Sequence, residues 1–129
     1  MPSDEAIPAD IQRFIATSID SVPHLEAVLL LRYNAGAEWD AKMLAQQLYL
    51  SEKRSGELLE SLCAAGFIVP SKENPLFYQY GPASSGMAEI IDRLSEAYMK
   101  HLVEVHNLIH SKINKQAQQF GDAFKWKKE

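Results

Sequence analysis

The chain has 129 residues, 47% of them hydrophobic, which suits one domain with its own core and at most one appended element. Its net charge is minus four, and residues 1–82 alone carry six Lys or Arg against eleven Asp or Glu. This acidity argues against strong non-specific nucleic-acid binding, because phosphate contacts supply most of that affinity. The single cysteine, Cys63, excludes an internal disulfide bond.

Nothing in the sequence predicts secretion or a membrane span. Residues 1–5 contain no basic region followed by an apolar stretch, as a secretory signal requires. The longest apolar run, residues 27–31, is far shorter than the roughly 20 residues that cross a bilayer. We therefore expect a cytoplasmic protein.

The first part of the chain predicts a flexible leader and two helices. Residues 1–9 contain two prolines and the polar run Ser3-Asp4-Glu5, so they form the expected leader. A helix should begin near Pro8 to Asp10 and carry Ile11, Phe14 and Ile15 on one face. After a break at residues 18–21, Pro23 suits the first turn of a second helix. That helix, residues 24–33, is apolar over more than one face, which predicts the most buried helix of the domain.

Residues 39–80 predict two short helices followed by a hairpin. Asp40 is a good N-cap for a helix over 41–48, and Ser51 for a helix that Gly66 ends. The β-rich runs 67–69 and 76–80 flank a turn-forming segment. Helix, tight turn, helix and two-stranded ribbon, in that order, predict a winged helix-turn-helix domain over residues 10–82. The expected fold class is mainly α with a small β-hairpin.

A long helix is expected over residues 83–119. No proline or glycine interrupts residues 87–113, and apolar residues recur there at alternating steps close to four and three. Such a stripe predicts pairing with another helix, and homodimerisation is its simplest use. The alternative is a helix that folds back over the N-terminal helices of its own chain. The predicted dimerisation residues are Met87, Ile91, Leu94, Tyr98, Leu102, Val105 and Leu108.

The last ten residues, 120–129, form a basic aromatic tail. Five lysines lie between Lys112 and Lys128, against one acidic residue, Asp122. An apolar face in such a segment can dock on a partner subunit, another protein or a membrane surface. A packed C-terminus is the alternative. The candidate docking residues are Phe120, Phe124 and Trp126.

These features resemble the winged helix-turn-helix superfamily of bacterial regulators, with an organisation like that of the MarR and PadR groups. Residues 21–27, Trp39 and residues 120–124 are also similar to those of short proteobacterial proteins of this fold. The resemblance implies that the second helix of the motif enters the major groove while the wing touches the DNA beside it. Mapped onto this chain, the candidate DNA-binding residues are Ser51, Lys53, Arg54, Ser55, Glu57, Lys72 and Asn74.

Lys53 and Arg54 are the most specific candidates for contact with DNA, because they follow the expected N-cap of the second helix. Arg54 has the geometry to read a guanine in bidentate fashion, whereas Lys53 suits a phosphate. The alternative is that both are solvated residues that balance neighbouring carboxylates. The chain departs from the regulator groups in carrying acid at Glu52, Glu57, Glu60 and Glu73.

We expect no catalysis, cofactor or metal. The sequence has no glycine-rich phosphate loop and no supported nucleophile–histidine pair. His106 and His110 stand four residues apart, but no cysteine or carboxylate completes a zinc pattern.

Two functions fit this sequence. The first is a homodimeric, DNA-binding transcriptional regulator. The alternative is a winged-helix module that binds proteins and has no appreciable affinity for DNA, which would explain the acidity directly.

Overall fold

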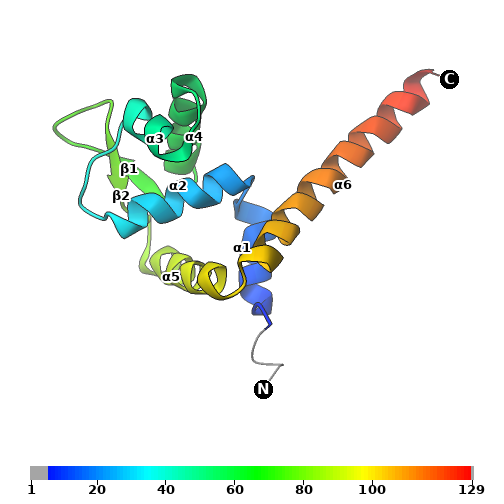
Figure 1. The fold of residues 1–129 in the computed structure, drawn as a ribbon, viewed down its shortest axis with the longest axis horizontal. Coiled ribbons are helices and arrows are strands. Elements are labelled where there is room, and N and C mark those ends of the chain that lie inside the picture. The colour runs from blue at the N-terminus through cyan, green and yellow to red at the C-terminus, as the bar shows by residue number, and fades with distance from the viewer. Residues whose placement is uncertain (1–5, 129) are drawn as a thin grey trace. The chain divides into compact units, whose positions relative to one another are not determined.

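A computed structural model describes the backbone of residues 6–128 and the side chains of residues 6–115. These residues form a mainly helical structure with one two-stranded antiparallel sheet (Figure 1). The chain divides into two compact units. The terminal unit comprises Met1–Val22 and Glu96–Glu129, and the central unit comprises Pro23–Ser95.

Helix α2, Val22–Tyr33, forms where the sequence predicted it, with Pro23 in its first turn. Its aliphatic residues are buried on several sides of the helix, which confirms the expectation of a strongly buried element. Arg32, near its end, pairs with Asp92 of helix α5, Ser85–Lys100, at 2.9 Å and also donates to the Ser95 hydroxyl at 3.3 Å. The buried residues of α2 are Leu25, Ala27, Val28, Leu29 and Leu31.

Helices α3, Ala41–Leu48, and α4, Glu52–Ala64, pack against each other and begin at the predicted caps. The Asp40 carboxylate accepts a hydrogen bond from the Met43 amide at 2.9 Å, and the Ser51 hydroxyl accepts one from the Arg54 amide at 3.0 Å. Between the helices, Tyr49 has a left-handed backbone, with φ 57°. The tight turn is thus made without glycine, and its tyrosine is 94% exposed.

Gly56 in the interior of α4 gives a prediction for stability. A Cβ atom there would meet the Ala41 Cβ at 3.6 Å, an ordinary contact. Because glycine in a helix interior costs about 0.5–1 kcal/mol relative to alanine, Gly56→Ala should raise the free energy of unfolding by that amount. Urea titration followed by circular dichroism measures it. A loss of stability would mean that α3 must move to admit the methyl group.

The hairpin consists of β1, Ile68–Pro70, and β2, Tyr78–Tyr80. The first strand is shifted by one residue from its predicted position, and the second is two residues shorter than predicted. Val69 pairs with Gln79 at the centre of the register. Trp39 adds a bridge that the sequence did not predict, since its backbone exchanges hydrogen bonds of 2.7 and 2.8 Å with Tyr78. This bridge joins the residue before the Asp40 cap directly to the hairpin.

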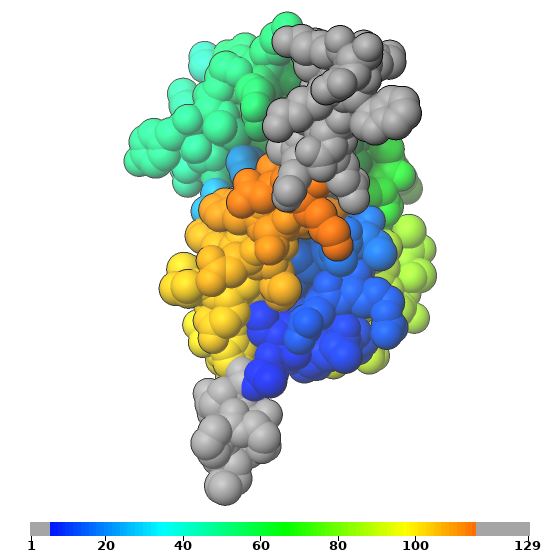
Figure 2. All heavy atoms as spheres, turned by 90° about the vertical axis from the view of Figure 1, so that its right-hand side faces the viewer, coloured from blue at the N-terminus to red at the C-terminus, as the bar shows by residue number. Residues whose placement is uncertain are grey.

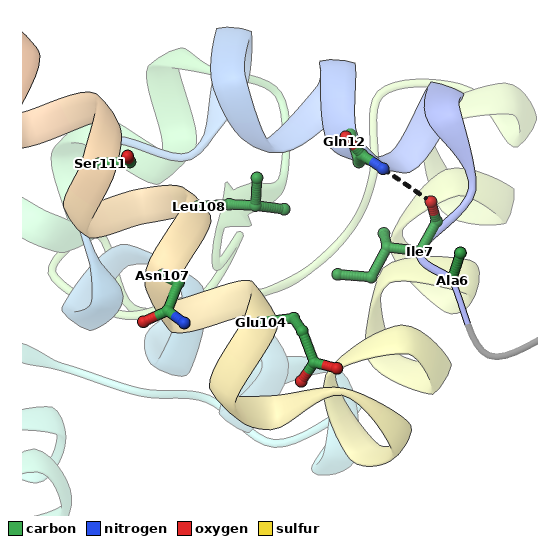
Figure 3. A pocket seen from close by; sticks show the side chains of 7 residues that line it. All are labelled: Ala6, Ile7, Gln12, Glu104, Asn107, Leu108 and Ser111. Atoms are coloured by element: carbon green, nitrogen blue, oxygen red, sulfur yellow. Dashed lines mark hydrogen bonds between the residues drawn. The ribbon is translucent and has the colours of Figure 1, made fainter. Parts of the chain in front are cut away.

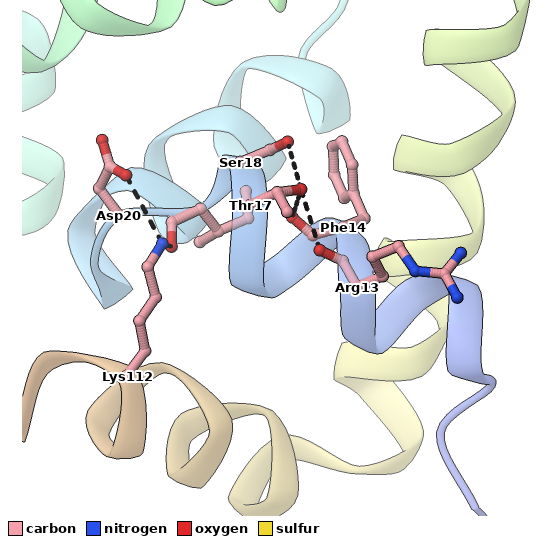
Figure 4. Close-up of polar contacts among 7 residues, drawn as sticks. Arg13, Phe14, Thr17, Ser18, Asp20 and Lys112 are labelled. Carbon is pink, nitrogen blue, oxygen red and sulfur yellow. Dashed lines mark hydrogen bonds and ion pairs between the residues drawn. The ribbon is translucent and has the colours of Figure 1, made fainter. Parts of the chain in front are cut away.

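The terminal unit pairs α1, Ala9–Ser18, with α6, Leu102–Lys128. Residues 6–20 and 102–115 lie side by side in both views (Figures 1 and 2). Lys112 fastens the two helices, donating to the Ile19 carbonyl at 3.1 Å and lying 3.7 Å from the Asp20 carboxylate (Figure 4). The predicted leader ends in a packed residue, because Ile7 is buried.

The expected single helix over 83–119 is wrong: α5 ends at Lys100, and α6 begins at Leu102. The Tyr98 hydroxyl lies 2.8 Å from His106 Nε2, although residues eight apart on a straight helix are about 12 Å apart. The chain therefore bends at the buried His101, whose Nδ1 lies 3.5 Å from the Glu104 carboxylate. The sequence did not predict this bend, because no proline or glycine lies near it and the apolar spacing continues across it.

No single helix within residues 6–128 is long and apolar enough to cross a membrane.

Candidate nucleic-acid interface

The first turn of α4 carries Lys53 and Arg54, the two main candidates for contact with DNA, on its exposed side. Lys53 and Arg54 are exposed, and neither forms an ion pair with any residue whose side chain the structure describes. The hydroxyl of Ser51 is engaged by the Arg54 amide, so its role is to start the helix. The N-terminal end of a helix also carries a partial positive charge, which adds to that of the two side chains.

Ser55 does not belong to this interface, which corrects the sequence prediction. Its side chain is fully buried, on the side of α4 that also buries Leu58, Leu59 and Leu62. Its hydroxyl has no hydrogen-bond partner among the described residues. The buried side of α4 begins at residue 55, because residues three, four and seven positions further on lie along the same stripe.

Asn74 is exposed, and its side-chain amide is engaged within the protein. Its amide donates to the Glu38 carboxylate at 2.8 Å, and the Ser71 hydroxyl donates to the other oxygen of that carboxylate at 2.5 Å. These two hydrogen bonds, that of Ser71 first, lower the pKa of Glu38. The loop of the hairpin is thereby tied to the segment that leads into α3.

The loop around Lys72 is held at several points. The Ser71 amide donates to the Phe77 carbonyl at 2.8 Å, and the Phe77 amide to the Asn74 carbonyl at 2.9 Å. The Ser71 hydroxyl also accepts from the amides of Glu73 and Asn74 at 3.3 Å. Lys72 is exposed on this ordered loop.

The Glu38 contacts predict a pH dependence of stability. Because folding lowers the pKa of Glu38 from its usual 4.5, its contribution is present above pH 4.5 and is lost as the pH falls through the folded value. Glu38→Gln should therefore be less stable than the native chain at pH 7, and the difference should shrink below pH 4.5. Urea unfolding between pH 7 and 3.5 tests this. A difference independent of pH would assign the effect to packing.

Carboxylates share the exposed side of α4. Glu57 and Glu60 lie one and two turns beyond Lys53 and are exposed. Glu73 neighbours Lys72 on the hairpin. The positive charge of the interface is therefore confined to the first turn of α4 and to one lysine of the loop.

The predicted dimerisation stripe is largely occupied within the chain. Ile91, Leu94 and Val105 are fully buried, so they offer no surface to a second copy. Met87, Tyr98 and Leu108 are half-buried, and of the seven predicted residues only Leu102 is exposed, at 49%. Folding within the chain thus accounts for much of the stripe, as the alternative interpretation expected.

Two exposed apolar residues beside Leu102 were not predicted. Met99 is 72% exposed at the end of α5, and Val103 is 63% exposed in the first turn of α6. We call Met99, Leu102 and Val103 the corner cluster. The heptad spacing did not single out Met99 and Val103, because it identifies only residues in register with the stripe.

A hollow of about 430 Å³ lies between the start of α1 and the first half of α6 (Figure 3). Ile7 and Leu108 supply apolar surface, and Gln12 is fixed by a 2.9 Å hydrogen bond from its amide to the Ile7 carbonyl. Glu104, which directly follows Val103 in the chain, is among the lining residues. The remaining lining residues are Ala6, Asn107 and Ser111.

The predicted tail and the histidines were the remaining candidates in the sequence. The side chains of Phe120, Phe124 and Trp126 lie outside the described residues. The Nε2 atom of His106 is hydrogen-bonded to the Tyr98 hydroxyl, at 2.8 Å. Among the described residues, no group of three histidine, cysteine or acidic side chains is placed to hold a metal ion.

No protein-family model, curated protein or solved structure matches this chain.

Proposed function

We propose that this chain is a DNA-binding, transcription-regulator-like protein that presents the first turn of α4 and the hairpin loop of a winged helix-turn-helix to the duplex. The observation that carries the proposal is the exposure of Lys53 and Arg54, free of ion pairs among the described residues, directly after the Ser51 cap. The ordered loop that holds Lys72 supplies the second contact. In this arrangement Lys53 meets a phosphate and Arg54 a base edge.

The carboxylates nearby limit the expected affinity. Asp40 and Glu38 accept hydrogen bonds within the protein. Glu57 and Glu60 are exposed to solvent on α4, the helix that also carries Lys53 and Arg54. Their repulsion of phosphate opposes the few cations, so non-specific binding should be measurable only at low salt. Specific recognition then depends strongly on Arg54.

Fluorescence anisotropy of a mixed-sequence duplex, titrated with the full chain at about 20 mM salt and upward, tests the proposal. Binding should weaken steeply with salt, because each neutralised phosphate adds about −0.9 to the slope of log K against log salt. An absence of binding at the lowest salt would overturn DNA recognition by this protein.

We further propose that two copies pair through the terminal unit. A two-fold axis brings each surface against its symmetry-related counterpart, so a patch that carries both a projection and a hollow can fit itself. The corner cluster supplies exposed apolar side chains, and the hollow between α1 and α6 is lined by Glu104, the next residue along the chain after Val103. Figure 2 shows residues 6–20 and 96–115 on a common face.

The charges around this patch are also self-complementary. Lys100 stands within the corner cluster and is exposed, as is Glu104 on the rim of the hollow. Their contacts within the chain are loose, at 3.7 Å to Glu96 and 3.5 Å to His101. Each is therefore available to pair with the opposite charge of a second copy.

A further inference from the structure

A second hollow lies within the central unit, between α3, α4 and the hairpin. Its volume is about 370 Å³, at the small end of the roughly 300–1,000 Å³ range of ligand sites. The wall from α4 consists of residues 52, 56, 59 and 60, which share one side of that helix. Ala41, Leu76 and Tyr78 complete an apolar surface around it. We call this hollow the α4–hairpin groove.

Two features of the groove have no evident role in the fold. Gly56 lies where an alanine would fit, at 3.6 Å from Ala41, yet the chain keeps a glycine and leaves the wall open there. Leu76 is 80% exposed at the rim, although burying a leucine side chain is worth about 1.5–3 kcal/mol. Both features suit a surface that another molecule covers.

The charge of the groove identifies what that molecule carries. Asp40, Glu52 and Glu60 line it, against one cation, Lys42. Asp40 is engaged by the Met43 amide, but Glu52 and Glu60 are exposed and form no ion pair with a described residue. Burial raises the pKa of Tyr78, and the carboxylate of Glu60 raises it further, so Glu60 lies near the aromatic side of the groove.

We propose that the α4–hairpin groove binds a peptide segment of a partner protein in which an arginine stands next to a large apolar residue. The guanidinium pairs with Glu52 and Glu60 and lies against the ring of Tyr78. The apolar neighbour covers Leu76 and the wall at Gly56. A duplex is excluded as the occupant, because the same carboxylates repel phosphate.

The test is an NMR titration of the ¹⁵N-labelled full chain with the synthetic peptide acetyl-Gly-Leu-Arg-Gly-amide at low salt. Saturable shifts should centre on the amides of Gly56, Leu59 and Tyr78. Glu52→Gln with Glu60→Gln should weaken binding about tenfold, because it removes both partners of the guanidinium. The matched control is Glu57→Gln with Glu73→Gln, which removes the same charge outside the groove and should leave the affinity within twofold.

Several outcomes would overturn the proposal. One is the absence of saturable shifts at the groove. Another is equal binding of a peptide with glutamine in place of arginine, and a third is an equal loss in the control variant. The outcome is separate from that for DNA, because Glu52→Gln with Glu60→Gln should leave duplex affinity unchanged or increase it, whereas peptide affinity falls.

Discussion

Leu102→Asp with Val103→Asp should convert a dimer of this protein into a monomer. In the proposed dimer these two side chains enter the hollow of the second copy, where no lining residue is a cation and the carboxylate of Glu104 repels an added acid. Burying unpaired charge costs several kcal/mol, so the dissociation constant should rise by about 100-fold or more. Sedimentation equilibrium of the full chain over a range of concentrations measures this change.

The folded monomer should tolerate these substitutions. Both residues are exposed and lie in the first turn of α6, where acidic side chains interact favourably with the helix dipole. Leu76→Asp with Tyr49→Asp is the matched control, since it places two carboxylates at exposed apolar positions of the central unit. Equal effects of both variants, or a monomeric native chain at all concentrations, would refute this interface.

Exchanging the charges of Lys100 and Glu104 tests whether these two residues face each other across the proposed dimer interface. Lys100→Glu alone should weaken the dimer by about twofold to 30-fold, because an exposed ion pair is worth about 0.2–1 kcal/mol and two-fold symmetry counts it twice. Adding Glu104→Lys should restore the affinity, as it recreates the pair with reversed signs. Failure of the double variant to recover would show that these residues do not face each other.

Lys53→Ala with Arg54→Ala should weaken duplex binding by about 10-fold to 150-fold at low salt. Loss of a bidentate base contact accounts for about 1–3 kcal/mol, and loss of phosphate contacts lowers the salt slope by about 0.9 for each. Anisotropy titrations at four salt concentrations separate the two effects. The single variants should differ, with Lys53→Ala changing mainly the slope and Arg54→Ala the discrimination between sequences.

The matched control for DNA is Arg13→Ala with Lys115→Ala, which removes the same charge from exposed positions of the terminal unit. It should leave duplex affinity within about threefold, because only long-range attraction changes. Melting temperatures of both variants should match that of the native chain, since none of the four residues is buried. A control that binds as weakly as the Lys53 and Arg54 variant would point to diffuse attraction without a defined site.

Local signals in the sequence determined most of the helix and strand boundaries. Asp40 and Ser51 start their helices because a side-chain oxygen satisfies an amide three residues later, an interaction contained within four residues. Gly66 follows the end of α4 with a φ of 87°, a conformation that glycine adopts without strain. The hairpin position, and the candidates Lys53, Arg54 and Lys72, also came from nearby residues alone.

Only the tertiary structure decided which side chains remain available for binding. Asn74 is engaged by Glu38, 36 residues away, and Ser55 is buried on the inner side of α4. The apolar stripe beyond residue 83 is split by a bend at His101 and largely buried within one chain. Periodicity records that a face is apolar, but it does not say what covers that face. Contacts between distant residues supply that information, and they exist only once the chain has folded.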